Sequence, residues 1–487
     1  MGRGSTDAVL DRKAARSHKA PKKPPASEYD ALDTSLGATG WNAAEFLKYF
    51  KKSEHLPENQ PTGDAAYPLT PDPALYGSGP IPNTVPVHMP AIAAHYYKAC
   101  TALGLHFNPF GGNGNNGGVW PALAAVDPAH VTRVSADVAY LAPMRGASNL
   151  TVLTEARAAR ILFEGNTATG VQFHEQDGAA VRMVHAKKEV VLCAGIGDRE
   201  YIPEGVPQVV NLPGVGSNLH AAVAVRKLEE YKAHGTGPLS TASLFYSYLP
   251  LKAFMDADKI MEIRRMADEA TAESIGIASA QALELLKKWL HDDEIQPRII
   301  MGPMHLPMLP GGDFVLGKHY FFFSIILVHP FSHGAAHYSP TGAHGLEVSL
   351  NLLSNPIDKQ ILTAGVQFVR KIVTQDALAK EAGARAVAPG PAVLDAQAAE
   401  AWVQQALATA FHPLGTAAML PRAEGGVVDP QLKVYETENL RVHLWFVEDC
   451  HEVDASVIPV QLSCHPMGTI YAIAEKAADM MKASSTQ

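Results

Sequence analysis

One glycine-rich run, residues 107–120 (FNPFGGNGNNGGVW), most limits the folds open to this chain. Gly112, Gly114 and Gly117 match G-x-G-x-x-G, the pattern of the phosphate-binding turn in dinucleotide-binding βαβ units. That turn follows a strand and opens a helix, so that backbone N–H groups at the helix start face a pyrophosphate. Here an Asn-Pro pair precedes the glycines and a Trp-Pro pair follows them. We therefore predict a Gly/Asn loop without the nucleotide fingerprint.

Length and composition are those of an ordinary globular protein. The chain has 487 residues, several times the usual size of one domain, so we expect two domains. Hydrophobic residues make up 47% and charged residues 18%, and the formal net charge is -9. No strongly basic balance is present, and we expect no nucleic-acid partner.

Two segments bear on membranes and targeting. The longest apolar stretch, Tyr320–Val328, is far shorter than the roughly 20 residues of a membrane-spanning helix, and its aromatic and β-branched residues predict a buried strand. We therefore expect no membrane span. Residues 1–26 are basic and Pro-rich without an apolar core, which predicts a disordered tail and no signal peptide. A cytoplasmic location is the default expectation.

Four cysteines, Cys100, Cys193, Cys450 and Cys464, are too few and too scattered for a disulfide framework. A reducing compartment is therefore expected. Two of them are followed directly by a histidine, but zinc ligands usually come in pairs about two to four residues apart. We expect no metal.

Apolar periodicity predicts an alternation of helices and strands. Helices are indicated by apolar residues three and four positions apart, and strands by short apolar, β-branched or aromatic runs between turn residues. The predicted helices are 41–53, 91–103, 252–290 with an interruption at Gly276, 358–373, 395–410 and 471–481, and the predicted strands are 149–163, 188–193, 320–328 and 346–353.

Ordered blocks in the last third of the chain carry the strongest functional signal. They are FHPLGTAAMLP (411–421), GGVVDPQLKVY (425–435), NLRV (439–442) and a long block from VDASV to KAADM (453–480), preceded by SADVAYLAP (135–143), KKEVVLCAG (187–195) and HPFSHG (329–334). From about Tyr29 to Met481 these blocks resemble the glucose-methanol-choline (GMC) oxidoreductases, especially fungal aryl-alcohol and glucose dehydrogenase-like members.

The resemblance implies an α/β fold. It consists of an incomplete FAD-binding, Rossmann-like domain plus a substrate domain with an antiparallel sheet and covering helices. It also implies FAD as the cofactor and a small-molecule alcohol as the substrate. The expected segments are 27–147 (substrate domain and loops), 148–220 (FAD-binding domain), 221–400 (substrate-binding domain) and 401–487 (completion of the FAD domain and active site).

Two histidines match the family's catalytic pair. His412 matches the base that takes the hydroxyl proton while hydride moves to flavin N5, and His465 matches the second active-site histidine, which fixes the same oxygen. Neutral imidazole suits such a base near pH 7. For either residue taken alone, the structural alternative is favoured: a core histidine for His412 and a cap of the final helix for His465.

The resemblance also places flavin contacts. Ala158 would meet the adenine, Ala194 and Gly195 would pass the ADP part, Asp454 and Ala455 would approach the ribityl and pyrophosphate region, and Met467 would donate its backbone N–H to the pyrimidine. Ordinary packing is the alternative for all six, since small residues are common in cores.

The chain departs from the family where the cofactor belongs. The family's opening strand, G-x-G-x-x-G turn and helix have no counterpart here, and HLWFVEDCHE (443–452) stands between blocks that are contiguous in the family. Two interpretations stay open: an FAD-dependent enzyme acting on CH–OH donors, or a non-catalytic truncated remnant, such as a pseudoenzyme or an incomplete gene model, that cannot bind FAD alone. Non-redox chemistry in the same pocket is a third.

Overall fold

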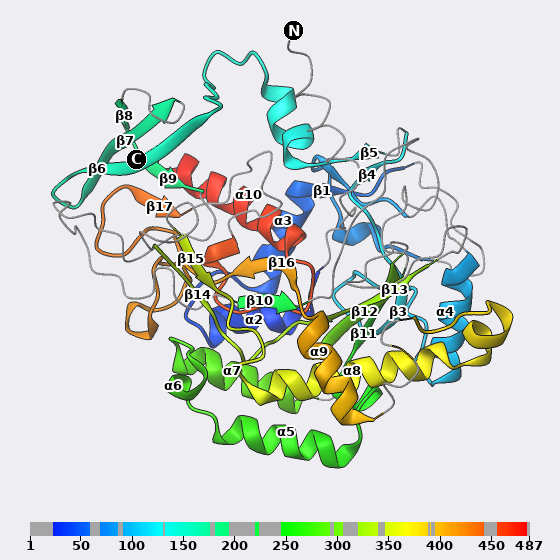
Figure 1. Cartoon of the computed structure of the whole chain (residues 1–487). Coiled ribbons are helices and arrows are strands. Elements are labelled where there is room, and N and C mark those ends of the chain that lie inside the picture. Colours follow the sequence, from blue (N-terminus) through cyan, green and yellow to red (C-terminus); the bar gives the residue numbers. More distant parts are fainter. Residues whose placement is uncertain are drawn as a thin grey trace, which may run out of the picture.

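The computed structural model describes thirteen parts of the chain. They are residues 23–58, 69–85, 91–129, 132–175, 181–193, 220–223, 245–292, 297–304, 320–338, 346–387, 390, 395–442 and 455–484. Within them the architecture is mixed α/β (Figure 1).

Most helices lie close to predicted ranges, but the first one was not predicted and the range 252–290 divides into three helices. The helices are α2 (Ala26–Thr34), α3 (Ala43–Ser53), α4 (Ala91–Ala102), α5 (Ala257–Glu269), α6 (Ala272–Ile275), α7 (Ala280–His291), α8 (Pro356–Val373), α9 (Ala396–Ala406) and α10 (Met467–Ser484). Side-chain caps set several starts: Asn42, Ser279 and Asn355 each accept a backbone N–H from the first turn that follows. Gly276 ends α6 with φ +73°, as the predicted interruption requires.

A six-stranded antiparallel sheet forms the centre, in the order β16-β10-β13-β12-β11-β3. Its strands are β3 (Gly118–Pro121), β10 (His220–Val223), β11 (Phe245–Leu249), β12 (Ile299–Met304), β13 (Phe322–Leu327) and β16 (Thr409–Leu414). β3 begins at Gly118, within the glycine-rich run, so the run leads into a strand and opens no helix, which confirms the prediction that it is no nucleotide fingerprint.

Both faces of this sheet are buried, with alternate residues facing opposite ways. Ile299, Ile325 and Leu327 belong to the large core shared with the helices, and Gly365 lets α8 approach closely, since a Cβ there would lie 3.1 Å from Ile325. The opposite face carries a second, aromatic cluster of Trp120, Ala122, Tyr246, Tyr248, Ile300, Ile326, Val328 and Ala410. The predicted antiparallel sheet with covering helices is confirmed.

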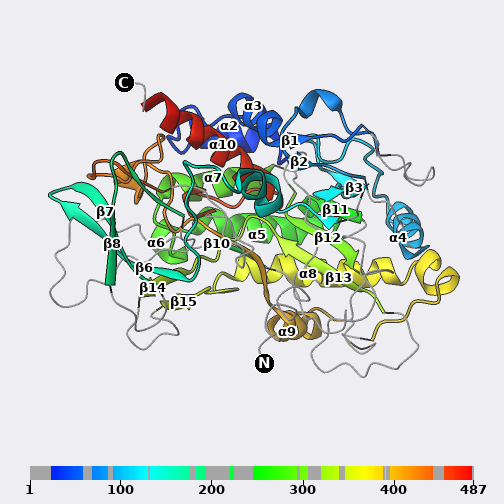
Figure 2. The ribbon, with the colours of Figure 1, turned by 90° about the horizontal axis from the view of Figure 1, so that it is seen from above.

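The remaining strands form smaller sheets. A meander of β6 (Ala156–Glu164), β7 (Thr167–Glu175) and β8 (Val181–His185) projects from the body of the molecule (Figures 1 and 2). β9 (Val190–Leu192) pairs in parallel with β17 (Leu440–Val442), as in a Rossmann-like sheet. Three further pairs are β1 (Glu54–His55) with β2 (Ile81–Pro82), β4 (Val126–Asp127) with β5 (Thr132–Arg133), and β14 (Ala335–Tyr338) with β15 (Leu346–Ser349).

Several sequence expectations differ from the structure. The strand predicted for 346–353 ends at Ser349. The helix predicted for 395–410 ends at Ala406, because β16 starts at Thr409 and pairs with β10. The strand predicted for 149–163 starts only at Ala156. Lys23 falls within the expected disordered tail but is 6% exposed, because its ammonium pairs with the buried Glu54 carboxylate at 2.9 Å. Residues 1–22 lie outside the described residues.

Candidate active site

His412 and His465 lie side by side in the interior. His412 sits on β16, and its ring contacts that of His465, which packs against Tyr246 of the aromatic cluster. His465 lies two residues before α10. Nδ1 of His465 and Nε2 of His412 are 3.3 Å apart, the rings cross at 77°, and each residue is 4% exposed. In an N–H···N bond one nitrogen accepts, so at least one ring is neutral.

Backbone hydrogen bonds explain how residues 53 positions apart meet. After β16 the chain runs beside the 3-10 turn Ala455–Val457: Gly415 N–H donates to the Ala455 carbonyl, and Ala417 N–H donates to that of Ser456. This ladder draws the segment leading to His465 against the end of β16. The two histidines are therefore held by main chain on both sides.

Tyr246 is a third member of the site, and the sequence analysis missed it. Its ring on β11 lies 5.1 Å from that of His465, at 60°. The residue is 5% exposed. Its run, FYSYL, has the composition of a strand and nothing more specific. The face of the sheet on which the Tyr246 ring lies depends on the sheet register, which the sequence does not show.

Two buried polar atoms lie on the segments that carry the histidines. Oγ1 of Thr416 and Oε1 of Gln461 have no hydrogen-bond partner among the described residues, although each residue is only 1% exposed. A buried acceptor without a donor is unfavourable. A bound molecule that carries hydroxyl and N–H groups, as the ribityl chain and pyrimidine of a flavin do, fits these acceptors.

The expected flavin contacts are distributed unevenly. Met467 is half-buried at the first turn of α10, and Ala455 is 3% exposed in the turn beside Gly415. Ala158 is exposed on β6. Ala194, Gly195 and Asp454 lie outside the described residues. The residues present thus suit the isoalloxazine end of FAD, and the contacts expected for the adenine stay a prediction.

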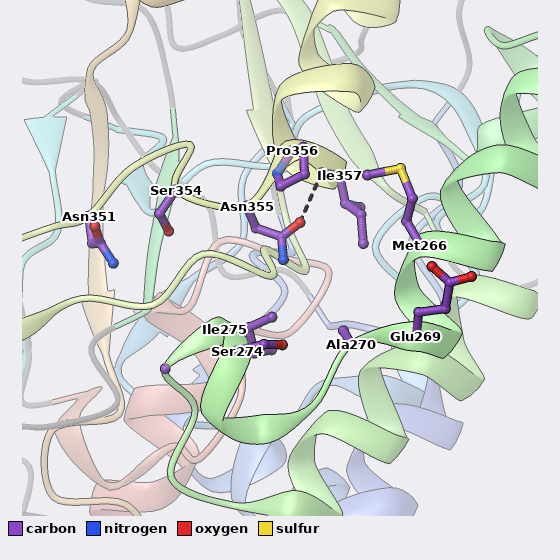
Figure 3. Close-up of a pocket in the computed structure, with 11 residues that line it drawn as sticks. Met266, Glu269, Ala270, Ser274, Ile275, Asn351, Ser354, Asn355, Pro356 and Ile357 are labelled. Atoms are coloured by element: carbon purple, nitrogen blue, oxygen red, sulfur yellow. Dashed lines mark hydrogen bonds between the residues drawn. The ribbon is translucent and has the colours of Figure 1, made fainter.

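A separate pocket of about 370 Å³ opens where α5 and α6 meet the start of α8 (Figure 3). Met266 and Glu269 line it from α5, and Asn355 lines it from the α8 cap, where its Oδ1 accepts the Ile357 N–H at 2.9 Å. The pocket includes neither histidine. It is distinct from the site built around them.

Nowhere in the described ranges do three His, Cys, Asp or Glu side chains gather as metal ligands would. Likewise, none of the helices described above combines the length and apolarity needed to cross a bilayer.

Two solved structures have a similar fold. The fold resembles a Chaetomium thermophilum FAD-dependent oxidoreductase (TM-score 0.80, 23% identity, 96% of this chain and 84% of that one). It also resembles a fungal aryl-alcohol oxidase (TM-score 0.80, 22% identity, 98% and 86%). The fold is that of an FAD-dependent oxidoreductase, with an FAD-binding and a substrate domain.

Sequence comparison supplies the family. The N-terminal GMC oxidoreductase model matches residues 19–226, and the C-terminal one matches residues 330–474. A GMC oxidoreductase family protein of Malassezia sympodialis, Mala s 12, is 28% identical over 94% of this chain and 76% of its own length. The chain belongs to the GMC oxidoreductase family, and its cofactor is FAD.

Proposed function

We propose that this FAD-dependent oxidoreductase oxidises the CH–OH group of a small-molecule alcohol, with His412 as the base and His465 as its partner. The supporting observation is the buried contact between the two imidazoles, 3.3 Å from nitrogen to nitrogen. Two convergent ring nitrogens, one of them necessarily an acceptor, suit a substrate that must lose a hydroxyl proton and have its oxygen held in place.

The two histidines and the aromatic face have different roles in the proposed reaction. A hydroxyl group entering between the rings gives its proton to His412, and His465 donates a hydrogen bond to the same oxygen. The aromatic face around Tyr246 keeps water away, so these bonds act in a low-dielectric site. FAD, when bound, accepts the hydride that leaves the substrate carbon. Thr416, Ala455 and Met467 are the described residues best placed to hold its flavin end.

The test is anaerobic reduction of the FAD-bound chain by a panel of alcohols that includes benzyl alcohol and pyridoxine. We expect His412→Ala to slow reduction by about 10²- to 10⁴-fold, the range for loss of a general base. His465→Ala should slow it less, since water can replace one hydrogen bond. His291→Ala, at an exposed histidine on α7, is the matched control and should reduce like wild type. Equal rates in His412→Ala and wild type would remove His412 from the role of base.

A second candidate is a GMC chain that does not retain FAD by itself. The observation in its favour lies in and beside the three-stranded meander that carries Ala158. The same region exposes several apolar side chains: Val152, Leu153, Val181, Met183 and Val184, each more than half exposed. Gel filtration of the chain mixed with FAD separates the candidates, because the remnant elutes colourless.

The domain segments proposed from the sequence can be tested in the same way. Residues 148–220 and 401–487 should belong to one cofactor domain, which agrees with the parallel pairing of β9 with β17. FAD should then protect both segments together from limited proteolysis. Protection of one without the other would argue for different boundaries.

A further inference from the structure

Helix α2 holds the turn that leads into His465. Glu28, in its first turn, is 0% exposed. Its Oε2 accepts the backbone N–H of Ser463 at 2.8 Å, and its Oε1 accepts the Ser463 hydroxyl. Ser463 is also 0% exposed and lies two residues before His465. One carboxylate thus fixes both the main chain and the side chain of this turn.

Helix α2 also binds the segment of chain that follows His465. The next residue on α2, Tyr29, shares a hydrogen bond of 2.7 Å between its hydroxyl and Oγ1 of Thr469. Thr469 is in the first turn of α10. Adjacent residues of α2 therefore bind the chain before and after His465, more than 430 positions away in sequence. An element from the start of the chain sets the position of a histidine near its end.

The Glu28 carboxylate is itself anchored by a buried cation. Nη1 of Arg298 lies 3.0 Å from Nδ1 of His329, and Nε2 of His329 lies 3.5 Å from Oε1 of Glu28. A guanidinium can only donate, so His329 Nδ1 accepts and its proton sits on Nε2, facing Glu28. Burial lowers the pKa of His329, in keeping with a neutral ring, and lowers that of Arg298 to about 9, which leaves the guanidinium charged at neutral pH.

These contacts form one line of groups from Arg298 through His329 and Glu28 to Ser463. All four residues are at most 1% exposed. A lone buried carboxylate would be strongly unfavourable, and the guanidinium beyond the imidazole balances its charge. Two hydrogen bonds from Ser463 and the neighbouring His329 imidazole surround this carboxylate. A backbone contact alone could hold the Ser463 turn. Here several buried charged and polar groups hold it instead.

We propose that Glu28 is a positioning residue for His465, holding the Ser463 turn so that His465 Nδ1 meets His412 Nε2. The inference rests on the proposed function of the histidine pair. Glu28 does not touch the reacting atoms. It acts through Ser463, and its loss should misdirect the His465 ring without removing it.

The experiment compares Glu28→Gln with Asp30→Asn in the full, FAD-bound chain. Both variants neutralise one carboxylate on α2, but Asp30 accepts the Ala43 N–H at the surface, away from His465. Stopped-flow reduction by alcohol gives the reduction rate constant and the substrate Kd separately. Selective ¹⁵N-histidine labelling gives the ring signals of His465, assigned by their loss in His465→Asn, without any substrate.

In Glu28→Gln we expect the His465 signals to shift and flavin reduction to slow by about 10- to 100-fold, as small misplacements do, with Kd unchanged. Asp30→Asn should match wild type in both measurements. A Glu28→Gln protein with wild-type His465 signals and an unchanged rate per bound flavin would overturn the inference, even if its melting temperature fell. If Glu28→Gln does not fold, Ser463→Ala, which removes only the hydroxyl donor, takes its place under the same criteria.

The two proposals fail separately. If no alcohol reduces the wild-type flavin, the proposed oxidation is wrong, and the histidine spectra alone decide the role of Glu28. If alcohol reduces wild type and Glu28→Gln equally well, the oxidation stands and the positioning role is refuted.

Discussion

Asp358 should make the stability of this protein depend on pH in an identifiable way. The residue is in the first turn of α8 and is 1% exposed. Its two carboxylate oxygens accept the backbone N–H groups of Phe331 and Ser332 at 2.8 and 2.7 Å. These bonds anchor the loop that follows β13 and carries His329. The perturbation we choose is Asp358→Asn.

Burial raises the pKa of Asp358 from 3.8 to about 6, against the opposing effect of its hydrogen bonds. The sign follows from proton binding. As pH falls through about 6 the folded protein takes up a proton, while the unfolded chain does so only near 3.8, so the free energy of unfolding rises as pH falls between these values. At about 1.4 kcal/mol per pKa unit the gain is about 3 kcal/mol.

Asp358→Asn lacks this titration. In addition, the NH2 group of the new Asn faces one of the two backbone N–H groups. This contact between two donors leaves a buried N–H without an acceptor and should cost about 1–3 kcal/mol of stability at any pH. The free energy of unfolding of the variant is therefore lower than that of wild type, and this difference should grow by about 3 kcal/mol between about pH 7 and about pH 4.

Guanidinium unfolding followed by tryptophan fluorescence measures this difference at each pH. Asp376→Asn removes an exposed carboxylate beyond the other end of α8 and serves as the control. A difference that is constant with pH, or that narrows on acidification, would refute the assigned pKa and its cause.

Two further predictions concern packing and buried charge. Gly111→Ala should destabilise the protein by about 1–3 kcal/mol or more, because the new Cβ would fall 2.0 Å from the Trp120 side chain, whereas Gly117→Ala meets nothing closer than 3.8 Å and should be nearly neutral. Chemical denaturation of both variants compares them, and equal losses would contradict the packing described. Breaking the Lys23–Glu54 pair with Glu54→Gln should cost about 3–5 kcal/mol, while replacing both residues by Met and Leu should cost less. If the double variant is less stable than Glu54→Gln, an uncompensated buried charge is not the cause of the loss of stability in Glu54→Gln.

Part of the fold was predictable because its signals are local, although only β13 of the central sheet lay in a predicted strand. The apolar spacing of α3, α7 and α8, the stop at Gly276 and the apolar run of β13 all lie within short windows of sequence. The end of α9 was not predictable in this way: residues 407–410 have helical composition, but pairing with a distant strand makes Thr409 the start of β16. Tertiary pairing overrides local preference there.

The candidate site was predictable in part. The motif blocks singled out His412 and His465 by resemblance, and the structure brings them to 3.3 Å; their catalytic roles stay predictions. Glu28 and Tyr246 gave no signal, since their importance depends on contacts across about 220 residues or more and on sheet register. Of the expected flavin contacts, Ala194, Gly195 and Asp454 lie outside the described residues, and the role of Ala158 stays a prediction.

The most direct measurement is the visible absorption spectrum of the full chain after incubation with FAD, desalting and anaerobic addition of alcohol. We predict the yellow bands of oxidised flavin at about one flavin per chain, bleached by alcohol in wild type and scarcely bleached in His412→Ala. A desalted chain without flavin absorbance, or a flavin that His412→Ala reduces as fast as wild type, would contradict the account.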